Sequence, residues 1–133
     1  MDNSKERLHD VFFYGLYMDP VLLEQKGVEP RNARIALVEN YELRIGNKVT
    51  LLRAEGKQAH GIVYSLTHDD IYSLYRGAGL DDFAPEAMMV RIGGEGIPAL
   101  CCNLIEPPAE NESNSRYESN LKAAMSRLGV PLG

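Results

Sequence analysis

The first half of the chain consists of short apolar runs separated by turn-forming residues. Val11–Tyr14 is a β-branched and aromatic run that Gly15 ends, which predicts a first strand. Asp19-Pro20 precedes Val21–Lys26 and Gly27 follows it, which are the start and stop signals of a short helix. Further strand-like runs are Ala33–Val38, Tyr41–Ile45, Val49–Arg53 and, clearest of all, His60–Leu66.

Helical patterns occupy two places in the second half of the chain. Thr67-His68-Asp69-Asp70 resembles a capping box and begins one helix, whose apolar stripe ends before Gly77 and Gly79. Asp81–Pro85 is predicted to be a loop. The polar segment Glu106–Ser115 leads to a last helix, whose inner face consists of Tyr117, Leu121, Ala124, Met125 and Leu128.

Gly93–Gly96 lies between two strand-like runs, Ala87–Ile92 and Ile97–Leu104. Glycines at this spacing also occur in dinucleotide-binding loops, but such a loop needs a following helix whose N-terminus faces the pyrophosphate. The residues that follow here are strand-like, so a hairpin turn is predicted. Because strands and helices do not alternate regularly, the pattern favours an α+β fold with a small mixed, mostly antiparallel β-barrel and packed helices.

Length and charge narrow the class of protein. With 133 residues, the chain is expected to form one domain spanning residues 1–133. No apolar run approaches the ~18 residues of a membrane span, and Met1–Arg7 is too polar for a secretory signal. A net charge of −5 leaves no broad basic surface, so neither nucleic acid nor a membrane is an expected partner. We expect a cytoplasmic protein, and the sequence does not indicate its oligomeric state.

The two cysteines, Cys101 and Cys102, are neighbours in the sequence. Their Cα atoms are then ~3.8 Å apart, below the ordinary disulfide range, so reduced thiols are expected. His9, His60 and His68 form no cluster at metal-ligand spacing, and no serine or cysteine nucleophile is paired with them. No metal site is predicted.

The segment Phe12–Pro20 has a glycine between a predicted strand and a predicted helix. A glycine in that place is often only a turn. It is also a place where backbone N–H groups and a helix start meet, which suits an anion or a developing oxyanion. The residues alone leave both interpretations open.

Several motifs together resemble the γ-glutamylcyclotransferase-like family. Tyr14-Gly15-Leu16-Tyr17-Met18 is similar to the family's tyrosine–glycine–serine–asparagine–methionine loop. Glu39–Ile45 resembles its second signature strand, and His60–Thr67 resembles its glycine–hydrophobic–valine–tyrosine strand with the helix that follows. Tyr117–Pro131 resembles its terminal helix, so the resemblance covers about residues 10 to 131.

The resemblance implies a compact mixed barrel with packed helices and a cavity at the first loop. It implies a reaction on γ-glutamyl amides, in which the α-amine attacks the γ-carbonyl and releases 5-oxoproline and an amine. No metal and no cofactor take part in that reaction. Such chemistry needs a pocket that folds the substrate, donors for the carbonyl oxygen and a carboxylate that accepts the amine proton. Tyr14, Gly15, Leu16, Tyr17 and Met18 are the implied substrate-binding residues.

The chain departs from the family pattern where the catalytic glutamate is expected. Ala78 occupies that position in the stretch Leu74–Gly79, and a methyl group cannot accept a proton. Loss of a general base typically costs ~10²–10⁴ in rate, or roughly 3–5 kcal/mol of barrier. Leu16 and Tyr17 replace the loop's serine and asparagine, and Phe83 replaces a tyrosine that many members have.

Three acids follow closely enough to be considered as replacements: Asp81, Asp82 and Glu86. Glu86 is the preferred fallback because a strand can aim it inward. Two function classes remain. One is a γ-glutamylcyclotransferase-like enzyme with a relocated acid, and the other is a non-catalytic module that binds an amino-acid-like or carboxylate ligand or a protein partner. Ala78 favours the second, with weak or absent turnover.

Overall fold

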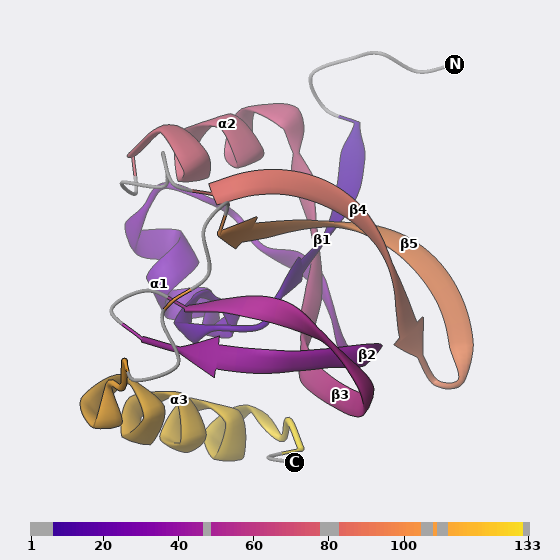
Figure 1. Ribbon diagram of the computed structural model, residues 1–133. Coiled ribbons are helices and arrows are strands. Elements are labelled where there is room, and N and C mark those ends of the chain that lie inside the picture. The colour runs from indigo at the N-terminus through magenta and orange to yellow at the C-terminus, as the bar shows by residue number, and fades with distance from the viewer. Residues whose placement is uncertain (1–6, 47–48, 78–82, 105–107, 109–111, 132–133) are drawn as a thin grey trace.

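The computed structural model describes residues 7–46, 49–77, 83–104, 108 and 112–131, with the backbone alone for 75–77, 83, 84 and 104. Five strands close into a barrel in the order β1-β3-β2-β4-β5 (Figure 1). The strands are β1 (Leu8–Phe13), β2 (Arg31–Ile45), β3 (Val49–Thr67), β4 (Phe83–Ile92) and β5 (Glu95–Leu104). The helical elements are η1 (Leu16–Met18), α1 (Pro20–Gln25), α2 (His68–Gly77) and α3 (Ser115–Leu128).

Neighbouring strands are antiparallel except for β1 and β5, which are parallel at the pair Val11–Leu100. The predicted α+β fold with a small, mostly antiparallel barrel is therefore confirmed. In Figure 1, α2 and α3 lie on opposite sides of this barrel. None of the helices in the described ranges is long and apolar enough to cross a membrane.

The strands β2 and β3 are longer than the sequence runs predict. Ala33–Val38 and Tyr41–Ile45 belong to one strand, because pairing with β3 resumes after a bulge between Glu39 and Tyr41. Asn40 has a φ of 65° at this bulge, and its side-chain oxygen accepts the N–H of Gly56 at 3.1 Å. The Asn40 side chain thus bonds the polar middle of β3, and pairing with β2 continues on both sides of it.

The predicted loop Asp81–Pro85 is wrong at its end, because residues 83–85 belong to β4. There Pro85 lies opposite Cys102 in the β4–β5 register. The predicted hairpin is confirmed, with a turn limited to Gly93 and Gly94, whose φ values are 60° and 86°. This turn leaves Glu95 and the rest of the glycine motif in β5.

Alternation along the strands produces two apolar layers. Phe12 and Tyr14 point into the barrel with residues such as Val63 and Val90, which form the interior cluster. Residues on the opposite strand faces, such as Phe13 and Tyr64, pack outward against the helices, with Leu23, Leu74, Leu121 and Met125. The barrel interior is therefore filled by side chains, and a ligand site has to lie at its rim or outside it.

Capping residues set the helix starts as the sequence indicates. Asp19 accepts the N–H of Val21 at 3.0 Å, and the Asp70 N–H donates to the Thr67 hydroxyl at 3.1 Å. Asn114 accepts the N–H of Tyr117 at 3.1 Å, and the last helix starts at Ser115, the residue at which the predicted polar segment ends. This cap places Tyr117 in the first turn of α3.

Candidate functional site

Glu86 belongs to the inward-facing row of β4. Met88 and Val90 of this row are buried in the interior cluster, whereas the alternate residues Pro85, Ala87 and Met89 are exposed. Two-residue periodicity puts Glu86 on the same face as Met88, one step nearer the end of the barrel, where it is exposed. We call this end the barrel mouth and define it by Tyr14, Thr50, Glu86, Cys101 and Asn103.

Asn103 of β5 holds the Glu86 carboxylate. Its Nδ2 donates to Glu86 Oε1 at 2.5 Å and lies 3.5 Å from the sulfur of Met88. Its Oδ1 accepts the N–H of Leu51 at 3.4 Å, and the residue is 6% exposed. Because both the NH2 group and the oxygen of this buried amide are hydrogen-bonded, the amide has one orientation and binds Glu86 through its NH2 group.

Tyr14 lies at the same level of the barrel. Counting three residues from the parallel pair Val11–Leu100 places it level with Asn103. Its hydroxyl donates to the Cys102 carbonyl oxygen at 2.6 Å and lies 3.4 Å from the Val49 carbonyl oxygen. Burial, reinforced by the nearby Cys101 thiol, raises the pKa of Tyr14 well above its usual value. Tyr14 is therefore a neutral donor rather than a base.

Two backbone N–H groups of the loop Gly15–Met18 donate hydrogen bonds within the protein. The N–H of Leu16 donates to the Tyr117 hydroxyl at 2.9 Å, and the N–H of Met18 donates to the Gly15 carbonyl oxygen at 2.9 Å. Both of these amides therefore have partners within the protein in this structure. The Met18 side chain is fully buried and its carbonyl oxygen accepts the Tyr64 hydroxyl at 2.6 Å. Ligand contacts by Tyr14 and by Gly15–Met18 stay a prediction.

Tyr117 of α3 is a member of this region that the sequence identified only as a core position. A Cβ placed on Gly15 would lie 2.5 Å from its hydroxyl oxygen, so the glycine allows the close approach. Burial raises the pKa of Tyr117, and the Leu16 amide works against that rise. In this structure the Tyr117 hydroxyl is the acceptor of the Leu16 N–H.

Ala78, Asp81 and Asp82 lie outside the described residues, and so does the side chain of Phe83. Among the predicted acids, the structure therefore places only Glu86.

The cysteines behave as the sequence predicts and form no disulfide. Cys101 is buried in the interior cluster, and burial raises the pKa of its thiol, as do Cys102 and Glu86. Within the described ranges, no group of three or more His, Cys, Asp or Glu side chains could hold a metal ion.

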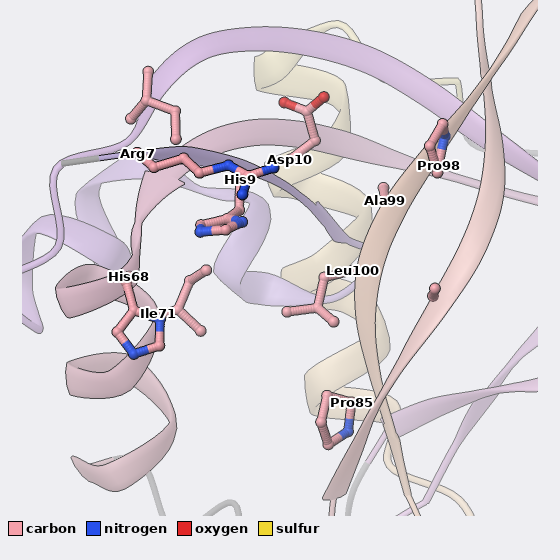
Figure 2. Close-up of a pocket in the computed structure, with 11 residues that line it drawn as sticks. Arg7, His9, Asp10, His68, Ile71, Pro85, Pro98, Ala99 and Leu100 are labelled. Carbon is pink, nitrogen blue, oxygen red and sulfur yellow. The ribbon is translucent and has the colours of Figure 1, made fainter. Parts of the chain in front are cut away.

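A separate hollow of about 560 Å³ lies between α2, the start of β1 and the outer face of β4 and β5 (Figure 2). His9 and His68 approach it from β1 and α2, and Leu100 lines it from β5. The Asp10 carboxylate points away from His9 and pairs with Arg34 at 2.7 Å. This hollow contains neither Glu86 nor any residue of the Gly15–Met18 loop.

The closed five-stranded barrel with its helices is the fold of solved γ-glutamyl cyclotransferase and AIG2-like proteins. A solved γ-glutamyl cyclotransferase superposes with a TM-score of 0.79 over 95% of this chain and 83% of that chain, at 16% identity. YkqA from Bacillus subtilis matches with a TM-score of 0.74 over 92% of this chain, at 19% identity. An AIG2-like protein from Mus musculus matches with a TM-score of 0.60 over 87% of this chain and 95% of that chain, at 14% identity.

The chain spans about half the length of YkqA, of which it covers 49%. No protein-family model and no curated protein matches its sequence. At these identities the structural likeness establishes the fold.

Proposed function

We propose that this protein closes γ-glutamyl amides to 5-oxoproline, with Glu86 as the proton acceptor in place of the missing acid at Ala78. The observation that supports this assignment is the position of Glu86 in the inward row of β4, at the same end of the barrel as Tyr14. Asn103 holds its carboxylate at 2.5 Å, while the residue remains open to solvent.

The reaction transfers an acyl group within one substrate. The α-amine nitrogen attacks the γ-carbonyl carbon, a C–N bond forms, and the amide C–N bond to the leaving amine breaks. Protons lost by the attacking nitrogen pass to the Glu86 carboxylate and from there to the leaving nitrogen, so the enzyme ends unchanged. Folding the substrate so that amine and carbonyl meet supplies much of the rate acceleration.

The carbonyl oxygen gains negative charge during the attack and needs a donor. The Leu16 N–H is the candidate donor, because its present acceptor is the neutral hydroxyl of Tyr117 at 2.9 Å. In this mechanism the Tyr117 hydroxyl moves aside when substrate binds.

The test is 5-oxoproline release from γ-glutamyl-alanine and from glutathione. We expect turnover by the wild type and a loss of ~10²–10⁴-fold in Glu86→Gln, because the amide cannot accept the proton. Glu55→Gln makes the same chemical change at an exposed position of β3 and serves as the control. Turnover that Glu86→Gln leaves intact would reject Glu86 as the base.

A second candidate function is non-catalytic binding of a small carboxylate, and the Tyr117 contact is the observation in its favour. If a ligand oxygen competes with the Tyr117 hydroxyl for Leu16, then Tyr117→Phe should bind 5-oxoproline more tightly than the wild type. An inactive wild type that Ala78→Glu does not rescue, together with this gain in affinity, would replace the enzymatic proposal by the binding one.

A further inference from the structure

We infer that Asn103 is a positioning residue for Glu86: its side-chain amide sets the direction of the carboxylate at the barrel mouth. This inference rests on the proposed function for its catalytic consequence. The contact itself can be tested without any activity.

The orientation of the Asn103 amide is determined by its other partner. Leu51 offers a backbone N–H at 3.4 Å, which can only be met by the amide oxygen. The NH2 group must then face Glu86, where it lies 2.5 Å from Oε1. The Asn103 NH2 group is a donor only, so it can bind Glu86 only through a carboxyl oxygen that accepts.

Among the residues that the structure describes, Asn103 is the hydrogen-bonding partner of Glu86. Glu86 is exposed, and a glutamate side chain has several rotatable bonds that a proton acceptor must hold still. Asn103 is suited to that role, because it is 6% exposed and packs beside Met88 within the barrel. The hydrogen bond from Asn103 to Glu86 thus joins the inward-facing residues of β5 to those of β4.

Asn103→Asp is the sharpest variant. It keeps an oxygen for Leu51 and nearly the same shape, but it replaces the NH2 donor with a carboxylate oxygen that faces Glu86. We expect a 10- to 100-fold lower kcat with little change in KM, because substrate contacts are untouched. The acidic limb of the pH–rate profile should move to higher pH, because two carboxyl groups at this distance share a proton. Among the described residues, the Cys101 thiol lies near Glu86, and Tyr14 and Cys102 lie near Cys101.

The matched control is Asn40→Asp, in which the side-chain oxygen retained is the one that accepts the Gly56 N–H. It should keep wild-type kcat and the wild-type pH profile.

A swapped pair separates the contact from the catalysis. Glu86→Gln/Asn103→Asp restores one donor and one acceptor with their places exchanged, so its melting temperature should recover most of what Asn103→Asp loses. The double variant should nevertheless stay inactive, because residue 86 no longer carries a base. Recovery of stability without recovery of turnover is the expected result.

Each contrary result has a separate meaning. Equal melting temperatures for all variants would show that Asn103 does not hold Glu86 and would overturn the inference. A normal melting pattern with full kcat in Asn103→Asp would overturn the positioning role. A wild type that releases no 5-oxoproline would overturn the proposed function and the catalytic consequence, whereas the melting series would still decide the contact.

Discussion

Gly15 and Tyr117 lie so close together that the effect of Gly15→Ala on the free energy of unfolding should change sign when Tyr117 is replaced by Phe. Gly15 has extended backbone angles, with φ −112° and ψ −159°, so alanine fits its conformation without strain. The obstacle is the Tyr117 hydroxyl, which would lie 2.5 Å from the new Cβ, whereas the ring carbon that carries it would lie at an ordinary 3.8 Å. Gly15→Ala must therefore push the hydroxyl away from the Leu16 amide.

The cost follows from the lost hydrogen bond. Breaking the 2.9 Å contact of Leu16 and leaving its part-buried N–H without an acceptor costs about 1–2 kcal/mol. Replacing glycine by alanine lowers the entropy of the unfolded chain, which stabilises the folded state by about 0.5 kcal/mol. Gly15→Ala should thus destabilise the protein by about 1 kcal/mol, or roughly 4 °C in melting temperature. In a Tyr117→Phe background the clash is absent, and the same change should stabilise by about 0.5 kcal/mol.

Urea unfolding followed by far-ultraviolet circular dichroism measures these differences, since the chain has no tryptophan to serve as a probe. The four proteins needed are the wild type, the two single variants and the double variant. Additive effects, or a Gly15→Ala variant as stable as the wild type, would refute the close contact between the loop and α3.

Two further predictions concern the barrel itself. Gly61→Ala should cost more than about 3 kcal/mol and yield mostly insoluble protein, because its Cβ would lie within contact distance of the backbone oxygen of Phe13, whereas Gly96→Ala should express normally. The Arg34 hydrogen bond lowers the pKa of Asp10, so the ion pair stabilises the fold above the unfolded pKa of Asp10 and is lost as the pH falls. Between pH 6 and pH 3, the free energy of unfolding measured with urea should therefore fall more for the wild type than for Asp10→Asn. Equal decreases would contradict this assignment.

The elements that depend on local hydrophobic and capping patterns could be predicted from the sequence. Those that depend on pairing between strands could not. Hydrophobic runs and caps located β1, the hairpin turn and the three helices to within a few residues. The two predicted runs Val49–Arg53 and His60–Leu66 belong to one strand, β3, which pairs with β2 on both sides of the bulge at Asn40. Residues 83–85 likewise belong to β4 only because β5 pairs with them.

The candidate site divides in the same way. Glu86 could be named from the chain, since an acid at the start of a predicted strand can point inward. Asn103 and Tyr117 could not, because their functions depend on neighbours that the fold brings from afar: Tyr117 and Leu16 are 101 positions apart. No local spacing carries that information.

The strands of the barrel pair over unequal lengths, and this difference determines which strands we expect to separate first. β2 and β3 pair from Ile45–Val49 onward as one long hairpin, a local structure that needs little loop closure. Among the described residues, the register pairs β1 with β5 at Val11–Leu100 and β2 with β4 at Leu37–Arg91, and both seams are shorter than the pairing of β2 with β3. We expect the β4–β5 hairpin, whose own register is continuous from Phe83–Leu104 to Ile92–Glu95, to separate from the barrel as a unit that carries both Glu86 and Asn103. Under native conditions, hydrogen exchange at these two seams should precede exchange within the long β2–β3 hairpin.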